Sequence, residues 1–228
     1  MIASSSPPVV SLNNLVKFFG RFAALRGITA EFASGRLYVI LGDNGAGKST
    51  LLRVIAGLME PCQGSFRVLG AKRFRDVAHR VGYMGHAPLL YDELSGMENL
   101  RYFAGLYGIH DDEVGRNAMR NVGLDPELTR RVGQYSQGMR QRLSLARAVL
   151  HSPELILLDE PFSNVDIHSA RDMAAVLGRV RDQGKAIFVV THQAALMEGV
   201  ADEFVHMSEG QIVSREETAR LAEARTTP

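Results

Sequence analysis

A glycine-rich run in the first quarter of the sequence has the spacing that phosphate binding requires. It matches the pattern G-x-x-x-x-G-K-[ST], in which backbone N–H groups wrap a phosphate chain and a following helix adds partial positive charge. The lysine of the pattern reaches the β- and γ-phosphates, and the hydroxyl next to it is a ligand for Mg²⁺. The candidate phosphate-loop residues are Gly42, Asp43, Asn44, Gly45, Ala46, Gly47, Lys48, Ser49 and Thr50. The sequence therefore predicts a site for a phosphate chain and Mg²⁺.

An acidic pair follows the apolar run LILLD. Asp159 ends this predicted strand, and Glu160 is the next residue. Ligands of open α/β sheets bind at the carboxyl edge, so Asp159 is expected to hold the Mg²⁺ coordination shell. Glu160 lies where a carboxylate polarises an attacking water. An acidic pair alone is more often a solvated loop, but a phosphate loop in the same chain favours the catalytic interpretation.

Two further segments offer contacts to phosphate. His192 ends the run AIFVVT and is predicted to emerge at the same sheet edge, facing a γ-phosphate. Ser136, Gln137 and Gly138 precede a helical pattern, so a helix N-terminus there forms a second anion site. If the two sites cannot reach one nucleotide within a monomer, a second copy must complete the site. The alternative is that Ser136 only caps a helix.

The elements that position these residues follow from apolar patterning. Continuous apolar runs at residues 36–41, Leu155–Asp159 and 186–192 predict buried strands of a parallel sheet, with a helix over residues 168–180 between the last two. A helix is expected after the phosphate loop, with Leu58 on its buried face. Between residues 86 and 150 the apolar spacing is helical, which predicts a helical subdomain inserted into an α/β core.

Composition excludes several classes of protein. Of the 228 residues, 46% are hydrophobic, and 26 basic residues nearly balance 25 acidic ones. A globular domain is expected, and nucleic acid is not an expected partner because a basic excess is missing. The single cysteine excludes an internal disulfide framework and a cysteine-based zinc site. No signal peptide or membrane-spanning run is visible, so any membrane role is expected to come through a partner. The histidines at positions 79, 110, 151, 168 and 206 are expected to be surface or capping residues.

The order of these motifs resembles that of ATP-binding cassette (ABC) ATPases over nearly the whole chain. GDNGAGKST resembles the Walker A loop, LILLDEP the Walker B strand, SNVD the D-loop, THQ the switch-histidine loop and YSQGMRQR the signature. The resemblance implies a P-loop NTPase core, a mostly parallel sheet with a small antiparallel β part, at residues 1–85 and 151–228. Residues 86–150 would form the inserted helical subdomain that carries the signature.

The same resemblance assigns roles to residues. It implies ATP and Mg²⁺ as cofactors, with catalysis by Glu160, His192 and Lys48. Phe19 matches the aromatic residue that stacks on adenine, and Asp166 belongs to the D-loop. Two copies of the chain would sandwich two ATP molecules, each between one Walker A loop and the partner's signature.

Two positions depart from the family pattern. The signature usually reads L-S-G-G-Q, and here Gln137 and Met139 replace its third and fifth residues. Family members also carry a Mg²⁺-ligating Gln after a strand such as VGYM, where this chain has His86. Either His86 takes over part of that role or the site works without it.

Within the family, the sequence looks most similar to ATPase subunits of haem exporters in cytochrome c maturation. That likeness implies a multi-spanning permease as a partner and a peripheral position at the cytoplasmic face of the cell membrane. The alternatives are an ATPase of a drug, lipid or polysaccharide exporter, or a non-transport ABC ATPase of DNA repair or translation. A small-molecule kinase would leave Ser136, Glu160 and His192 without a purpose.

Overall fold

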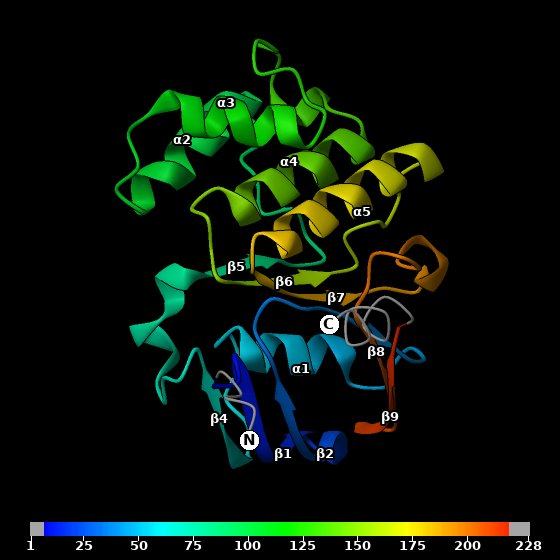
Figure 1. Cartoon of the computed structure of the whole chain (residues 1–228). Coiled ribbons are helices and arrows are strands. Elements are labelled where there is room, and N and C mark those ends of the chain that lie inside the picture. Colours follow the sequence, from blue (N-terminus) through cyan, green and yellow to red (C-terminus); the bar gives the residue numbers. More distant parts are fainter. Residues whose placement is uncertain (1–6, 219–228) are drawn as a thin grey trace, which may run out of the picture.

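The computed structural model describes residues 7–218, which form two sheets and the helices around them (Figure 1). The larger sheet has six strands in the order β5-β6-β7-β3-β8-β9. Neighbours from β5 to β8 pair in parallel, and β9 runs antiparallel to β8. The strand bounds are β3 Leu37–Leu41, β5 Val81–Met84, β6 Leu155–Asp159, β7 Ala186–Val190, β8 Glu203–Ser208 and β9 Gln211–Glu217. The expected parallel sheet is confirmed.

A smaller antiparallel sheet contains the first two strands of the chain. Its order is β2-β1-β4, with β1 spanning Val10–Phe19, β2 Phe22–Phe32 and β4 Gln63–Val68. The sheet lies on the far side of α1 (Lys48–Ile55) from the helical part of the molecule (Figure 1). The small antiparallel β part that the family resemblance implies is therefore present.

The remaining helices cover the opposite face of the parallel strands (Figure 1). Helices α4 and α5 lie next to the sheet, and α2 and α3 lie further out. Their bounds are α2 Gly96–Leu106, α3 Asp112–Asn121, α4 Gln137–Val149 and α5 Ile167–Asp182, with 3₁₀ turns η1 Phe74–Asp76, η2 Ala78–Arg80, η3 Val132–Gln134 and η4 Ala194–Leu196. None of the helices in the described range is long and apolar enough to cross a membrane.

The apolar strands are buried because both faces of the sheet are covered. Along β6, Leu155 and Leu157 belong to the core shared with α1 and the antiparallel sheet. Ile156 and Leu158 face the other core, which includes residues of α4 and α5. Alternate side chains of a strand point to opposite faces, so a strand covered on both sides must be apolar at every position.

Two local expectations were wrong. Helix α1 ends at Ile55, and Leu58 lies beyond it with 61% of its surface exposed, because the chain turns at Gly57 toward β4. His151 is half-buried: its ring stacks on Tyr107 with centroids 3.9 Å apart, and burial lowers its pKa. Apolar spacing does not reveal a polar ring that packs flat against an aromatic one.

A buried ion pair joins the end of α5 to the sheet. Arg181 Nη1 donates to Asp202 Oδ2 at 2.9 Å and to the carbonyl of Val200 at 2.8 Å. The same carboxylate oxygen accepts the backbone N–H of Leu37, at the start of β3, at 2.8 Å. Both charged side chains are at most 5% exposed. The pair therefore fixes α5 relative to β3 and the residue just before β8.

Candidate functional site

The phosphate loop connects β3 to α1. Helix α1 begins at Lys48 and has Gly47 as its N-cap, with no side chain that caps its first N–H groups and no acidic residue in its first turn. Gly42 and Gly47 have positive φ angles, 145° and 97°. A Cβ atom on Gly42 would lie 2.1 Å from the carbonyl oxygen of Met207, and one on Gly47 would lie 2.4 Å from that of Ala24. Only glycine fits at both positions, and the free N–H groups at the helix start suit an anion.

Lys48 is held inside this loop. Its Nζ donates to the carbonyl oxygens of Gly42 at 2.6 Å and Asp43 at 2.9 Å, and the residue is only 6% exposed. Burial lowers the pKa of Lys48, while nearby Glu160 and Asp159 raise it. A partly desolvated ammonium group gains strongly from a polyanion, because water no longer screens the attraction.

Ser49 and Asp159 form the part of the site that suits a divalent cation. Ser49 Oγ donates to Asp159 Oδ1 at 2.8 Å, which joins the first turn of α1 to the end of β6. The other oxygen, Asp159 Oδ2, is buried and has no hydrogen-bond partner among the described residues. Within residues 7–218 no cluster of three or more His, Cys, Asp or Glu forms a metal cage. That pattern fits Mg²⁺, which is bound through one or two protein oxygens and the phosphates of its substrate.

Glu160 follows β6 in a strained backbone conformation. Its φ angle is 54°, and its N–H donates to the carbonyl of Val190 at 2.8 Å. Its Oε1 lies 3.3 Å from His192 Nε2, with the carboxylate side chain 17% exposed. Burial raises the pKa of Glu160, and His192 and Lys48 oppose the shift. A raised pKa brings a carboxylate closer to the range in which it accepts and returns a proton.

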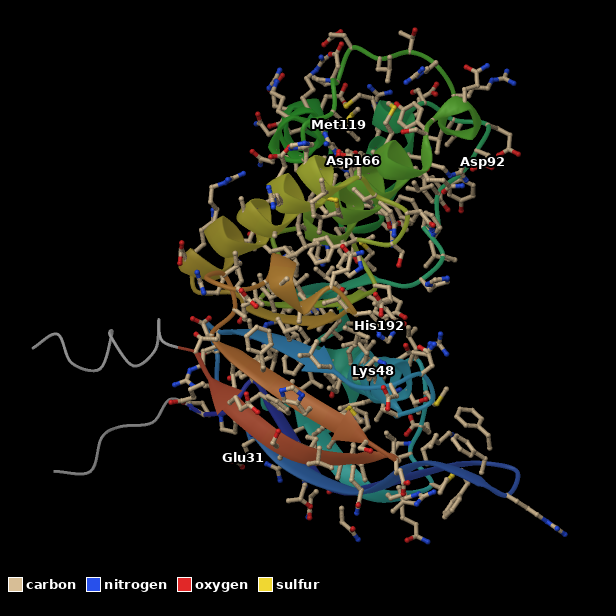
Figure 2. All side chains as sticks on the ribbon, turned by 90° about the vertical axis from the view of Figure 1, so that its right-hand side faces the viewer. Glu31, Lys48, Asp92, Met119, Asp166 and His192 are labelled. Carbon is tan, nitrogen blue, oxygen red and sulfur yellow. The ribbon has the colours of Figure 1, made fainter. Side chains whose placement is uncertain are left out.

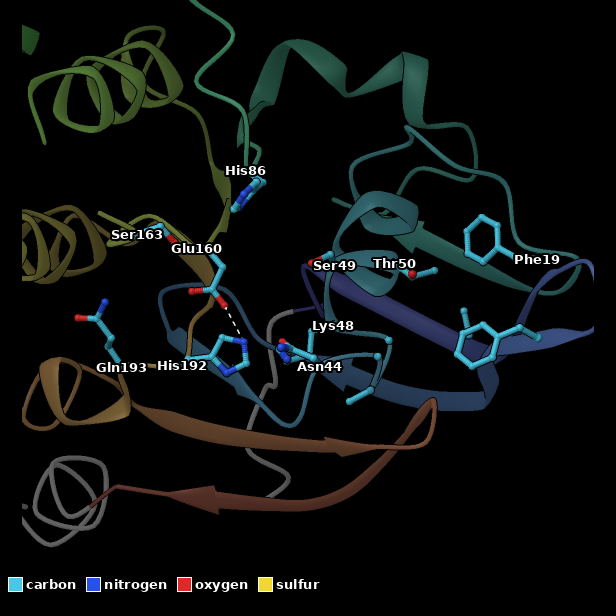
Figure 3. A pocket seen from close by; sticks show the side chains of 15 residues that line it. Phe19, Asn44, Lys48, Ser49, Thr50, His86, Glu160, Ser163, His192 and Gln193 are labelled. Atoms are coloured by element: carbon cyan, nitrogen blue, oxygen red, sulfur yellow. Dashed lines mark ion pairs between the residues drawn. The ribbon is translucent and has the colours of Figure 1, made fainter. Parts of the chain in front are cut away.

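Of these residues, Lys48, Ser49, Glu160 and His192 line one cavity of about 530 Å³, and Asp159 reaches it through its hydrogen bond to Ser49 (Figure 3). Phe19 and Phe22, 48% and 54% exposed, are placed on the antiparallel sheet and offer aromatic faces to a base. Lys48, Ser49, Glu160 and His192 gather at the other part of the cavity (Figure 3). The other lining residues are Ala24, Asn44, Gly45, Ala46, Gly47, Thr50, His86, Ser163 and Gln193.

The predicted signature and Asp166 do not line this cavity of the described chain. Ser136 caps α4, accepting the N–H of Met139 at 3.2 Å, and Gln137 and Gly138 are the first residues of that helix. Asp166 caps α5 by accepting the N–H of Ser169 at 2.9 Å. In Figure 2 Asp166 lies among the helices, whereas Lys48 and His192 lie together below them.

Phe22, Gln193 and Gln141 are near the site but were not among the predicted site residues. Phe22 lines the cavity together with Phe19. Its position only three residues after Phe19 in the sequence could have indicated a second aromatic face at the site. Gln193, next to the predicted His192, also lines it. Gln141 of α4 donates from Nε2 to the carbonyl of Glu160 at 3.3 Å, which joins the helix that begins at Gln137 to the turn that follows β6. No pattern in the sequence reveals that long-range contact.

Replacing Lys48 with Ala is expected to weaken ATP binding roughly 10- to 100-fold, because hydrogen bonds to charged groups contribute about 1.5–3 kcal/mol. Isothermal titration calorimetry with ATP and Mg²⁺ measures the change in Kd. The matched control is Lys72→Ala, which removes an exposed lysine outside the cavity. Equal affinities for the two variants would remove Lys48 from the binding site.

Comparison with known proteins agrees with this geometry. The sequence profile of the ABC transporter family matches residues 25–163. The chain is 35% identical to the ABC transporter ATP-binding protein NatA of Bacillus subtilis, covering 84% of this chain and 81% of that protein. It is 31% identical to the bacitracin transport ATP-binding protein BcrA of Bacillus licheniformis, covering 90% of this chain and 68% of that one. A fluoroquinolones export ATP-binding protein of Mycobacterium tuberculosis is 34% identical over 89% of this chain and 68% of its own length.

A solved structure shares the fold. The ATP-binding cassette MJ0796, in a dimeric post-hydrolysis state bound to ADP and Pi, superposes with a TM-score of 0.84 at 22% identity, covering 91% of this chain and 98% of that one. At this identity the likeness establishes the P-loop NTPase cassette fold. Together with the matched family profile and the relatives, it shows that the chain belongs to the ABC transporter family, as an ATP-binding subunit whose ATP hydrolysis is coupled to transport.

Proposed function

We propose that this chain is the motor of an ABC exporter and that its own cavity residues carry out hydrolysis. Glu160 accepts the proton of the water that attacks the γ-phosphate in line. Lys48 and His192 stabilise the negative charge that develops on the phosphoryl oxygens. The observation that carries this proposal is the grouping of Lys48, Glu160 and His192 around one cavity at the carboxyl edge of the parallel sheet.

Ser49 and Asp159 are the residues that would hold Mg²⁺, which supplies charge neutralisation for the β- and γ-phosphates when bound. The buried, unpartnered oxygen of Asp159 supports this assignment. The loop N–H groups from Gly42 to Thr50 bind the phosphates, and Phe19 stacks on the adenine. His86 lines the same cavity, which supports the proposal that its imidazole takes over part of the role of the Gln that the family carries.

We propose that two copies sandwich two ATP molecules. Ser136, Gln137 and Gly138 lie at a helix N-terminus, which suits an anion, but outside the cavity of their own chain. A nucleotide in that cavity would therefore meet them only on a second copy. Asp166 and Ser163 would lie at the same junction. The solved MJ0796 cassette is dimeric.

Gly138 allows a clean test of the sandwich. Nothing lies within 4 Å of a Cβ built on Gly138, so Gly138→Asp is expected to fold but to repel a phosphate. A chain with Glu160→Gln, which retains ATP, is expected to show dimer mass by light scattering with ATP and monomer mass with ADP. Adding Gly138→Asp should abolish that dimer. The matched control is Gly105→Asp, an exposed glycine of α2 that likewise has no neighbour within 4 Å of a Cβ atom. A dimer that survives Gly138→Asp would contradict the proposal, whether or not it survives Gly105→Asp.

A multi-spanning permease is the proposed membrane partner, with the chain peripheral at the cytoplasmic face and no nucleic acid in its function. The names of the relatives above include bacitracin transport and fluoroquinolone export. They support an exporter of antibiotic-like cargo ahead of the haem export that the sequence resemblance suggests. Haem export remains a hypothesis that none of these names supports.

Affinity purification from detergent-solubilised native membranes, followed by mass spectrometry, tests the partner and cargo class together. A multi-spanning exporter subunit unrelated to cytochrome c maturation is the expected result. Recovery of a cytochrome c maturation subunit would reinstate haem export. Recovery of only soluble or ribosomal proteins would overturn the transporter role.

A further inference from the structure

A second cavity, of about 540 Å³, lies between α5 and the segment that follows β7. Its lining is mainly apolar: Ala174 and Ala175 come from α5, and Leu196 and Val200 come from the opposite side. Ile167, 49% exposed, lies at the start of α5. An open apolar groove of this kind exposes surface that gains free energy when it is covered.

The groove shares a residue with the ATP site. Gln193 lines both cavities, and its Nε2 donates to the carbonyl of Phe162 at 3.4 Å. The 3₁₀ turn η4 (Ala194–Leu196) begins directly after Gln193, and Ala195 and Leu196 line the groove. An occupant of the groove would therefore contact the segment that follows His192 and restrict its movement.

The described chain ends beside this groove. Thr218 donates from its N–H to the carbonyl of Asp202 at 3.0 Å and from Oγ1 to the carbonyl of Ala201 at 2.8 Å. Ala201 follows Val200, a lining residue. Because an extended chain advances about 3.3–3.6 Å per residue, three residues beyond Thr218 span roughly 10 Å. A segment that continues from Thr218 is therefore within reach of the groove, and a linker this short gives an effective concentration on the order of millimolar.

The charged residues of segment 219–228 are opposite in sign to those of the groove, and they follow the same order along it. Val200 lies against the late part of α5, since Arg181 donates to its carbonyl at 2.8 Å, and Glu198 is two residues before Val200. A chain that enters the groove beside Ala201 therefore meets Val200 and Glu198 before it meets Arg171, which belongs to the early part of α5. The sequence after Thr218 reads ARLAEARTTP, in which Arg220 precedes Leu221 and Glu223 follows it. Leu221 is the large apolar residue between the two charges.

We propose that residues 219–228 bind in this groove of the same chain and restrain the segment carrying Gln193 and His192. Arg220 pairs with Glu198, Leu221 covers the apolar floor at Ala174 and Ala175, and Glu223 pairs with Arg171. Bound this way, the segment lowers the freedom of η4 and slows hydrolysis. The docking stands without the proposed function, whereas the effect on hydrolysis rests on it.

Disulfide trapping in the full chain tests the docking. Cys62 is the only cysteine, so a Cys62→Ser background carries one engineered pair, Ala175→Cys with Ala222→Cys. Ala175 is exposed in the groove. The matched control pairs Ala222→Cys with Ser65→Cys, an exposed position on β4 of the antiparallel sheet. Under mild oxidation we expect at least tenfold more intrachain disulfide in the first pair, and a loss of that excess when Leu221→Ser is added.

The outcomes separate the possible occupants. Equal yields for the two pairs would overturn the docking, and an interchain disulfide on a non-reducing gel would assign the groove to a second copy. ATP hydrolysis by the trapped chain is expected to be at least threefold slower than by the same chain after reduction. Equal rates would overturn only the proposed restraint on the segment carrying Gln193 and His192, and the docking would stand. If the intrachain disulfide forms but the chain is inactive both before and after its reduction, the result would count against the proposed function and not against the docking.

Discussion

Glu160→Gln is expected to lower ATP hydrolysis by about 10²–10⁴-fold, the range that a positioned general base contributes. The amide keeps the shape of the side chain but cannot accept the proton of the attacking water. ATP binding is expected to persist, because the proposed phosphate contacts come from the loop and Lys48, which line the cavity independently of Glu160. Steady-state phosphate release, measured beside ATP affinity on the same protein, gives both quantities.

Glu31→Gln is the matched control for this substitution. Glu31 is an exposed carboxylate on β2, outside the cavity, so its neutralisation should leave the rate unchanged. If both variants hydrolysed ATP at the wild-type rate, Glu160 would lose its role as the base. A parallel loss of ATP affinity in Glu160→Gln would assign it to binding.

Arg181→Met is expected to lower the free energy of unfolding by about 3–5 kcal/mol, the cost of breaking a buried ion pair by removing one partner. Methionine is of comparable length but leaves the Asp202 carboxylate buried without its guanidinium and removes a donor from the Val200 carbonyl. Urea denaturation followed by circular dichroism measures the change.

The control for Arg181→Met removes the second carboxylate that the same arginine contacts. Arg181 Nε also donates to Asp182 Oδ1 at 2.9 Å, but that carboxylate is 56% exposed. Exposed ion pairs contribute about 0–1 kcal/mol, so Asp182→Asn should be nearly neutral. If the two variants lost similar amounts of unfolding free energy, burial would not explain the contribution of the ion pair between Arg181 and Asp202.

Much of the fold followed from local sequence patterns. The runs that became β3, β6 and β7 are apolar because both faces of each strand are covered, and an apolar run without alternation indicates such a strand directly. The phosphate loop was recognisable because its glycines and Lys48 are consecutive in the chain. Asp159 and His192 were placed correctly at one sheet edge, since parallel strands end on the same side.

The rest depends on contacts between distant segments. The hydrogen bond from Gln141 to the Glu160 carbonyl and the stacking of His151 on Tyr107 arise only when helices pack. The end of α1 before Leu58 depends on where the chain must turn to reach β4. Such contacts leave no periodic pattern of apolar residues in the sequence, because they depend on how distant helices and strands pack against one another.

The close approach of the phosphate loop to two carbonyl oxygens has a consequence for folding. Gly47 packs against Ala24 of β2 and Gly42 against Met207 of β8, so the loop joins the antiparallel sheet to the parallel one. A local opening of either strand would release the loop as well. We therefore expect backbone amides of β2, β8 and the loop to exchange with deuterium as one cooperative unit, and bound nucleotide to slow all three together.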